Sequence, residues 1–431
     1  MSDQYIFWDL ETTGRNDKFD QITQVGAVLT DHNFEVKDKL EIHSKLRDGK
    51  WFEPGALLTT GVNPLNLFKN NYPNYYEASA QLYETFQQWS SPSAIFIGFN
   101  NINFDEPFLR QALYQNLMPE IYMTVTNNNV RMDVFEILRL VSVYSPEHIK
   151  FNTDDQGYPI LKLEEIFKKN DISISYEAGP HDAVFDSLVT LELNKILSIR
   201  CPQIWKSAYD FRLRETPKKF LLDHLVFTNT TFWGRRPTIK AQTLIAGIPG
   251  KNHHYLVYNL LFDPKKLQDL DDKELIKKMN DGVKRICEVF DGSKSKTLLN
   301  ESYCFKDSKF AEIGVDELRS RANFIKNNEE FCSRLIQLYI DNQKKWPEPY
   351  NVEERIFENF PSPQDKKVML DFHTSPNNKK FEISQQFKDD RYKELAIRII
   401  YEVAPHTLPE QEKRNYELEI QEKFNDDDKA K

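Results

Sequence analysis

Apolar positions in the first 200 residues follow strand spacing first and helical spacing later. Runs typical of buried or half-buried strands lie at residues 5–9, 23–31, 34–46 and 93–100. Helical spacing of apolar residues marks residues 105–117, 131–144, 161–172 and 181–197. Strands followed by alternating strands and helices predict an α/β domain that ends near residue 200.

The apolar pattern changes after residue 200. Short β-rich runs that Gly and Pro interrupt predict a small barrel or sheet at residues 224–260. Helical spacing returns at residues 317–327, 330–346, 353–360, 391–404 and 409–424, and a Pro-containing segment typical of a linker lies at residues 346–351. We therefore predict three domains, at residues 1–200, 201–350 and 351–431.

The composition of the 431-residue chain excludes several classes of protein. No apolar stretch approaches the roughly 18 residues that a membrane helix needs. The N-terminus lacks a basic region followed by a long apolar one, so we expect no signal peptide and a cytoplasmic location. The four cysteines are far apart and form no CxxC pair, which argues against a disulfide framework or a structural zinc site.

Charge is distributed unevenly along the chain. The formal net charge of −9 taken alone argues against a nucleic-acid-binding protein. Residues 201–250, however, hold eight Lys or Arg against three Asp or Glu, a local balance of +5. A basic segment within an acidic chain is compatible with a nucleic-acid contact, and it leaves more of the acidic residues for other roles.

Four carboxylates end or adjoin apolar runs: Asp9, Glu11, Asp105 and Asp186. Asp9 and Glu11 are two residues apart in a predicted strand, so both side chains point to one face. Oxygen ligands of this kind are the ones that Mg²⁺ prefers, and Mg²⁺ often completes its shell with substrate phosphates. Together these residues predict a site for a hard cation.

Each of these residues taken alone has a simpler structural explanation. A lone Asp after a strand more often caps the next helix, and a lone histidine such as His181 is more often a surface or helix-start residue. Asp182 and Asp133 are rival acids, and we interpret both as structural, Asp182 as a first-turn acid favoured by the helix dipole. The order of the three motifs, D-x-E, N-x-x-x-D and H-x-x-x-x-D, favours a functional reading of the set.

The same motifs resemble a known family. "FWDLETTG", "GFNNINFD" and "HDAVFD" are similar to the three motifs of the DEDDh (DnaQ-like) 3′→5′ exonucleases. Further stretches resemble the bacterial exodeoxyribonuclease I family in order and spacing, among them "GFNNINFDEPFLRQALYQN", "RMDVFEILR" and "FWGRRPTIKAQTLI". The resemblance covers essentially the whole chain.

This resemblance implies a multidomain α/β protein. It comprises an RNase H-like DnaQ-type exonuclease domain, an SH3-like β-rich domain and an all-helical C-terminal domain, which together enclose a channel for single-stranded DNA. The implied activity is processive 3′→5′ degradation of single-stranded DNA to 5′-mononucleotides, in DNA repair and recombination, by a monomer. The implied partner is the C-terminal tail of single-stranded-DNA-binding protein. Ser145 stands where a family member has an Arg linked to that partner, so the resemblance does not give the contacts.

The resemblance also gives the acidic residues a joint role. Asp9, Glu11, Asp105 and Asp186 would share two Mg²⁺ about 4 Å apart that bracket the scissile phosphate, with Mn²⁺ as a substitute. His181 would take the proton of the attacking water, which suits a side chain type with an ordinary pKa of about 6.5. The catalytic residues are then His181 and Glu11.

DNA binding needs other residues. Single strands are bound by cationic grooves with aromatic stacking surfaces, and Trp233 lies beside Arg235 and Arg236 within the basic segment. A turn with solvated charges is the simpler reading of the same stretch. Thr12 and Asn101 adjoin the metal motifs, and we expect them to contact the terminal nucleotide.

Two other functions fit part of the pattern. A DEDDh ribonuclease or a polymerase proofreading subunit would share the motifs, but the roughly 230 residues after the nuclease domain favour exodeoxyribonuclease I. A catalytically inactive protein that binds nucleic acid is a second alternative. The presence of all the motif residues argues against it, and a metal-dependent cleavage assay separates the two.

Overall fold

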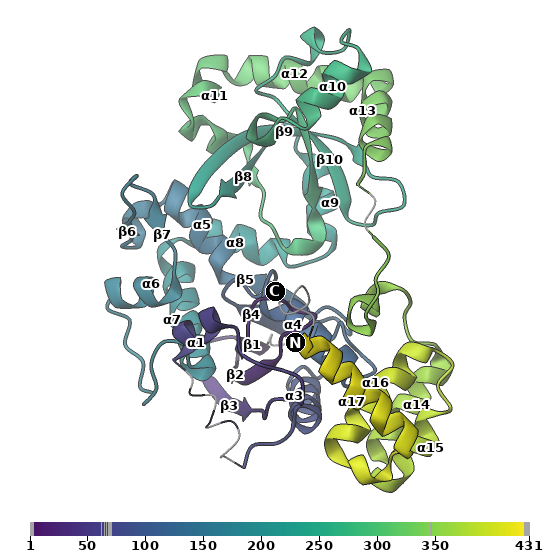
Figure 1. The fold of residues 1–431 in the computed structure, drawn as a ribbon. Helices are drawn as coiled ribbons and strands as arrows, with labels where there is room; N and C mark the ends of the chain where they lie inside the picture. The colour runs from purple at the N-terminus through teal and green to yellow at the C-terminus, as the bar shows by residue number, and fades with distance from the viewer. Residues whose placement is uncertain are drawn as a thin grey trace. The chain divides into compact units, whose positions relative to one another are not determined.

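The computed structural model describes residues 4–61, 63, 65, 67, 71–344 and 347–425 (Figure 1). The chain divides into two compact units. The first draws on Met1–Arg131, Ile174–Leu191 and Pro347–Lys431, and the second on Met132–Ser173 and Glu192–Trp346. This grouping differs from the three ranges predicted from the sequence, which stay a prediction of domain boundaries. Trp346, in the predicted linker, lies outside the described residues.

A five-stranded mixed sheet lies at the centre of the first unit. Its strands are β1 (Gln4–Thr12), β2 (Ile22–Thr30), β3 (Val36–His43), β4 (Ala94–Gly98) and β5 (Val130–Asp133), in the order β3-β2-β1-β4-β5. The last two residues of β5 are grouped with the second unit. β1 pairs antiparallel with β2 and parallel with β4, and β2 pairs antiparallel with β3. The first four strands confirm the four strand runs predicted from the sequence.

Helices from distant parts of the chain complete this unit. They are α1 (Pro54–Thr60), α3 (Tyr75–Trp89), α4 (Asp105–Gln115), the first half of α7 (Ala183–Arg200), α14 (Pro363–Thr374), α15 (Lys380–Ser384), α16 (Asp390–Val403) and α17 (Glu410–Asn425). Helix α3 begins with a capping box in which the Asn74 side chain accepts a hydrogen bond from the Glu77 N–H. The C-terminal segment of the described chain is therefore helical, as predicted.

The two faces of β1 have different surroundings. Ile6, Trp8 and Leu10 pack in the main core, together with residues of α3, α4, α14 and α16. The alternate residues, which include Asp9 and Glu11, point to the opposite face. The alternation thus separates the core-forming side chains of β1 from its carboxylates.

The second unit is built on an antiparallel sheet. Its strands are β8 (Phe227–Trp233), β9 (Arg236–Gly247), β10 (His254–Asn259), β11 (Cys287–Asp291) and β12 (Leu299–Asn300), in the order β11-β10-β9-β8-β12. The α-helices described for this unit are α5 (Val134–Tyr144), α6 (Leu163–Lys169), the second half of α7, α8 (Pro202–Phe211), α9 (Glu215–Asp223), α10 (Asp272–Met279), α11 (Ser308–Ile313), α12 (Val315–Asn327) and α13 (Glu329–Asp341). The β-rich region predicted at residues 224–260 is confirmed.

Two sequence predictions of helices are wrong in detail. Residues 131–144 were expected to form one helix, but Val130–Asp133 form β5 and the helix begins at Val134. The Asp133 carboxylate caps α5 by accepting a hydrogen bond from the Phe135 N–H at 3.0 Å, so its predicted structural role holds. The predicted helix at residues 353–360 is a 3₁₀ helix at Val352–Phe357.

Two exclusions made from the composition can be compared with the described residues. The four cysteines are free thiols. Among the helices of the described residues, none has both the length and the apolar character required to cross a membrane.

Candidate active site

Strand β1 carries two of the predicted metal ligands on one face. Asp9 is half-buried and Glu11 is buried. Asp9 lies opposite Gly26 and Glu11 opposite Gln24 in the antiparallel pair of β1 and β2. Paired residues of antiparallel strands point to the same face, so Gly26 and Gln24 line the same side of the sheet as the two carboxylates.

Asp105 lies near this face, at the start of the helix that follows the neighbouring strand β4. It is the first residue of α4, which follows β4 after a short loop, and β4 is parallel to β1. The Asp105 Oδ1 atom accepts a hydrogen bond from the Leu10 N–H at 2.9 Å. Because Leu10 lies between Asp9 and Glu11, this bond holds the Asp105 carboxylate next to the D-x-E pair.

Helix α7 brings in the fourth carboxylate. Asp186 lies in the first turn of α7, and this helix packs directly on β2. A Cβ atom at Gly26 would lie 2.0 Å from the carbonyl carbon of Ala183, so only glycine permits this approach. The Ser187 hydroxyl donates a hydrogen bond to the Gly26 carbonyl oxygen at 3.0 Å. The missing side chain on β2 therefore sets how near Asp186 comes to β1.

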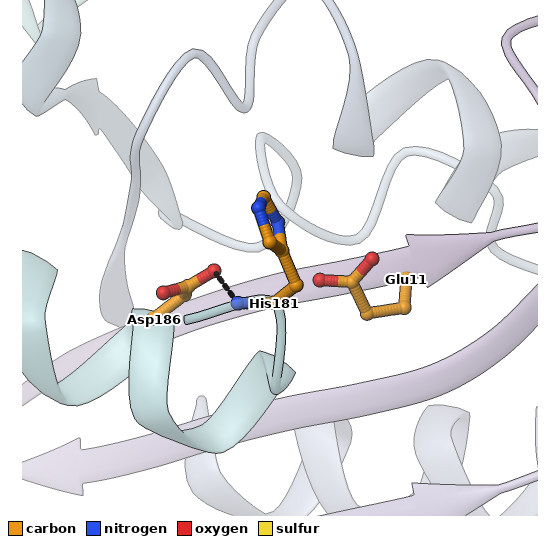
Figure 2. Close-up of side chains that lie close together, drawn as sticks. All are labelled: Glu11, His181 and Asp186. Carbon is orange, nitrogen blue, oxygen red and sulfur yellow. Dashed lines mark hydrogen bonds between the residues drawn. The ribbon is translucent and has the colours of Figure 1, made fainter. Parts of the chain in front are cut away.

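His181 lies two residues before α7, in a turn. Its φ of 68° is in the left-handed region, and its main-chain N–H donates a hydrogen bond to Asp186 Oδ2 at 3.2 Å. Figure 2 shows the His181 ring in the same group as the Glu11 and Asp186 carboxylates, from the turn, β1 and α7 respectively. Potential ligand atoms of these three residues all lie within 4.8 Å of one another.

The carboxylates perturb one another strongly. Burial, followed by repulsion from Asp186 and Asp105, raises the pKa of Glu11 to about 9. Burial and then the charges of Asp105, Asp186 and Glu11 raise the pKa of Asp9 well above its ordinary value. The fold thus gathers several carboxyl groups at a place where their ionised forms are disfavoured.

A divalent cation fits this arrangement. Burial and neighbouring carboxylates raise the pKa values of Asp9 and Glu11, and a bound cation would offset both effects. Hard cations take oxygen ligands, and a nearby cation reverses the effect of clustering on the pKa of a carboxyl group. The imidazole of His181 adds a nitrogen donor at the edge of the cluster. This donor set has the chemistry of a metal site.

Asp182, the rival acid, has structural contacts in the described residues. Its Oδ1 atom accepts hydrogen bonds from the Val184 and Phe185 N–H groups at 3.1 and 3.0 Å, which caps α7. Its Oδ2 atom accepts a bond from Gln24 Nε2 at 2.8 Å. These contacts agree with the structural reading of Asp182.

The two residues predicted to contact the terminal nucleotide are both buried. The Thr12 hydroxyl donates a hydrogen bond to the Gly14 carbonyl oxygen at 2.7 Å. Asn101 is fully buried beside Gly98, and neither polar atom of its side-chain amide has a hydrogen-bond partner among the described residues. Their contact with a nucleotide stays a prediction.

The predicted DNA-contacting residues lie in the second unit, at the tip of the β8–β9 hairpin. Trp233 pairs with Arg236 across a two-residue turn that contains Gly234, with a φ of 58°, and Arg235. The Trp233 side chain is 76% exposed. Arg235 forms an ion pair with Asp154 at 3.3 Å, and Arg236 is exposed. An exposed indole beside two cations is available for the predicted stacking role.

Gln24 belongs to the site although no motif includes it. Its amide lies opposite Glu11 and contacts the first turn of α7. The signal in the sequence is a single amide inside the apolar run "ITQVGAV", since a buried polar side chain requires partners. Which partners it takes is not visible from the run itself.

Comparisons of sequence with known proteins agree with the motifs. A family model described as the exonuclease I C-terminal domain matches residues 350–431. Exodeoxyribonuclease I of Buchnera aphidicola subsp. Schizaphis graminum (strain Sg) is 24% identical over 408 residues, which cover 91% of this chain and 82% of the relative. The resemblance recognised from the motifs is thereby confirmed.

Comparisons of structure extend over nearly the whole chain. E. coli exonuclease I in complex with a dA16 oligonucleotide has a TM-score of 0.85 at 20% identity, with 99% of this chain and 92% of the other covered. SSB/exonuclease I in complex with the inhibitor CFAM has a TM-score of 0.79 at 21% identity, with 97% and 90% covered. The predicted fold class is confirmed by these matches.

Proposed function

Because the chain resembles bacterial exodeoxyribonuclease I over most of its length, we propose that it is a single-stranded-DNA-specific 3′→5′ exonuclease that releases 5′-mononucleotides. The observation that carries the proposal is the convergence of Glu11, His181 and Asp186 within 4.8 Å, from a strand, a turn and a helix. The match to a solved exonuclease I that holds a dA16 oligonucleotide supports single-stranded DNA as the substrate.

Asp9, Glu11, Asp105 and Asp186 would hold two Mg²⁺, with Mn²⁺ as a substitute. Ions bound there would supply an activated water nucleophile and would neutralise charge on the leaving oxygen. The backbone of β1 orients one of these carboxylates, because the Leu10 N–H donates a hydrogen bond to Asp105. Close packing of α7 on Gly26 holds Asp186 against the same strand.

His181 would act as the general base. Its ring lies at the edge of the carboxylate group, where it can accept the proton of a water that attacks phosphorus. The Asp186 carboxylate accepts a hydrogen bond from the His181 main-chain N–H, which ties the position of the turn to that of the ligand. Glu11 would also be a catalytic residue, because its carboxylate lies in the same cluster as His181 and Asp186.

The β8–β9 hairpin would bind the single strand. Trp233 offers a stacking face, and Arg235 and Arg236 offer charge for the phosphates. Arg235 is already paired with Asp154, so a phosphate has to compete for it. We assign the first phosphate contact at the hairpin tip to Arg236 for this reason, and Thr12 and Asn101 keep their proposed contacts to the terminal nucleotide.

The same resemblance leads to the remaining parts of the proposal. A solved complex described as SSB/exonuclease I supports the C-terminal tail of single-stranded-DNA-binding protein as a partner. Ser145 leaves the contacts of that tail unassigned. We further propose that the protein is a processive monomer that acts in DNA repair and recombination in the cytoplasm.

A cleavage assay on a panel of substrates tests the proposal. The protein is incubated with 5′-labelled single-stranded DNA, the matching duplex and RNA of the same sequence, in Mg²⁺ or EDTA. We expect rapid Mg²⁺-dependent shortening of the single strand from its 3′ end, with 5′-mononucleotides as the products. If the protein cleaves RNA in preference to DNA, the proposed substrate is wrong and the proposed metal-dependent hydrolysis still holds. If it cleaves none of the substrates, the assignment as an enzyme is wrong.

A further inference from the structure

Gln24 is a buried amide on the active-site face of the first sheet. It is the residue of β2 that lies opposite Glu11, so its side chain emerges on the same face as that carboxylate. It is 7% exposed. A buried amide carries two kinds of hydrogen-bonding atom, and both must be satisfied for its burial to be tolerated.

Both ends of this amide are bonded to the start of α7. Gln24 Oε1 accepts a hydrogen bond from the Ala183 N–H at 3.2 Å. Gln24 Nε2 donates to Asp182 Oδ2 at 2.8 Å and to Glu41 Oε1 at 3.3 Å. One side chain of β2 thus holds a main-chain donor and a side-chain acceptor of consecutive residues, next to His181.

Asp182 extends the same connection into the helix. While its Oδ2 atom accepts from Gln24, its Oδ1 atom caps α7 through the Val184 and Phe185 N–H groups. The turn that this cap stabilises carries Asp186, and the residue before the cap is His181. Gln24 therefore bonds to the backbone and to the capping side chain of the segment from which the proposed metal ligand Asp186 and the proposed base His181 extend.

From this arrangement we infer that Gln24 is a positioning residue, which sets where Asp186 and His181 lie relative to Glu11. The inference rests on the proposed function, because it assigns Gln24 a role in the geometry of that site. Partners that orient metal ligands typically contribute about 10- to 100-fold to metal affinity or activity. Gly26 and Ser187 hold the next turn of α7 independently, so loss of Gln24 shifts the start of the helix without detaching it.

The first test is Gln24→Ala, with metal binding measured directly. We expect Mn²⁺ affinity, followed by electron paramagnetic resonance, to fall about 10- to 100-fold, with a similar fall in kcat and little change in KM for single-stranded DNA. Asn116→Ala is the matched control. Asn116 is a buried amide of the same unit, whose Nδ2 atom donates to the Ser79 hydroxyl and the Ala112 carbonyl oxygen at 2.9 Å each and whose Oδ1 atom accepts from Arg47 at 2.7 Å. None of these bonds goes to α7. The control should lower thermal stability and leave Mn²⁺ affinity unchanged.

A second test exchanges the amide and the carboxylate. Gln24→Glu alone places two carboxylates against each other, and Asp182→Asn alone places two amides there. The double variant Gln24→Glu/Asp182→Asn restores one donor and one acceptor between positions 24 and 182, at unchanged net charge, while the new carboxylate at position 24 still faces Glu41. We expect each single change to weaken Mn²⁺ binding and the double change to recover part of it, which measures the coupling between the two positions. Thermal unfolding of the same variants separates this coupling from a change in stability.

The possible outcomes separate this inference from the function on which it rests. If the wild-type protein binds Mn²⁺ and cleaves DNA while Gln24→Ala matches it in both, Gln24 has no positioning role. An equal loss in Gln24→Ala and Asn116→Ala would likewise overturn it, because stability would then explain both variants. If the wild-type protein binds no divalent metal, the proposed function itself is wrong.

Discussion

Glu11 combines burial with three carboxylate neighbours, and this combination makes the site sensitive to pH. Its pKa rises from an ordinary 4.5 to about 9, first through burial and then through Asp186, Asp105 and Asp182. The folded protein therefore keeps a proton that the unfolded chain releases. The contribution of this group to stability is full below about pH 4.5 and is lost as the pH rises towards 9.

We predict that the stability of the metal-free protein falls as the pH rises from 5 to 9, with a slope of up to about 1.4 kcal/mol per pH unit for one proton. Glu11→Gln removes this group, so its stability should depend less on pH across the same range. Urea unfolding in EDTA at several pH values measures the difference. Mg²⁺ should stabilise the wild-type protein more at high pH, because its binding releases protons. Parallel pH profiles for the two proteins would contradict the assignment.

His181 allows a second prediction at this scale. Since the proposed role of its ring is proton transfer, His181→Ala should slow cleavage of single-stranded DNA by about 10²- to 10⁴-fold under single-turnover conditions. Mn²⁺ affinity and DNA affinity should change little, because the four carboxylates and the hairpin remain. Loss of metal binding in this variant would make His181 a ligand of the metal instead of a base.

Local periodicity accounts for some of these residues and not for others. The shared face of Asp9 and Glu11 could be predicted because strand alternation is a local property. Gln24 could not be assigned a role in this way, since its partner Ala183 is 159 residues away in the chain. The left-handed turn at His181 also depends on packing at α7, and the sequence indicated only a break at Gly179 and Pro180.

At the scale of elements, the β8–β9 hairpin carries exposed residues at its tip, and contacts with α5 hold the strand below that tip in place. The Tyr144 hydroxyl and the Thr230 hydroxyl form a hydrogen bond of 2.6 Å between α5 and β8. The Arg139 guanidinium lies 5.0 Å from the centre of the Phe232 ring. These contacts lie directly before the tip, so Trp233 is held on a supported strand and not on a long loop.

The hairpin provides the third prediction. Trp233→Ala should weaken binding of single-stranded DNA by about 1–3 kcal/mol without changing its salt dependence, because stacking involves no counterion release. Arg236→Ala should lower the slope of log affinity against log salt by about 0.7, as expected for one lost phosphate contact. Fluorescence anisotropy at several salt concentrations measures both. Leu222→Ala, at another exposed apolar residue of this unit, is the control.

If Trp233→Ala binds single-stranded DNA with unchanged affinity, the simpler interpretation of this hairpin, a turn with solvated charges, is correct. A wild-type salt slope in Arg236→Ala would remove that residue from the phosphate contacts.

Boundaries between elements were the least predictable feature at this scale. The apolar spacing of residues 131–144 is continuous, and it gives no sign that β5 changes to α5 at Asp133. What ends the strand is a cap, in which the Asp133 carboxylate accepts from the Phe135 N–H. Apolar periodicity predicted that most of residues 131–144 are helical. It did not predict where the helix begins, because a cap can fix a helix start one or two residues away from the start of the apolar pattern.

For the whole molecule, the C-terminal helices share a core with the first sheet. Phe372 of α14 and Leu395 of α16 are fully buried in the same cluster as Trp8 of β1. A buried ion pair of 2.7 Å joins Arg47 to Glu402 of α16, and the other oxygen of Glu402 accepts from the Tyr75 N–H at 2.7 Å. Apolar spacing could predict the helices themselves, but not that they complete the core of a unit that begins at the N-terminus.

We predict that Glu402→Ala destabilises the first unit by about 3–5 kcal/mol, because it leaves the buried Arg47 charge without its partner. The C-terminal helices and the first sheet should still unfold together, since they share one core. Urea unfolding followed by hydrogen exchange of α3 and α16 measures both effects. Glu410→Ala, at an exposed position that begins α17, is the control. Separate transitions for α3 and α16 would mean that the C-terminal helices form an independent domain.

The central claim is that carboxylates gathered on β1, α4 and α7 form a metal site that cleaves single-stranded DNA. The most direct test compares Asp186→Asn with the wild-type protein, with Mn²⁺ binding and Mg²⁺-dependent shortening of 5′-labelled single-stranded DNA measured on the same preparations. The account predicts that the variant folds, binds Mn²⁺ much more weakly and loses cleavage. A variant that binds Mn²⁺ and shortens DNA as the wild-type protein does would contradict it.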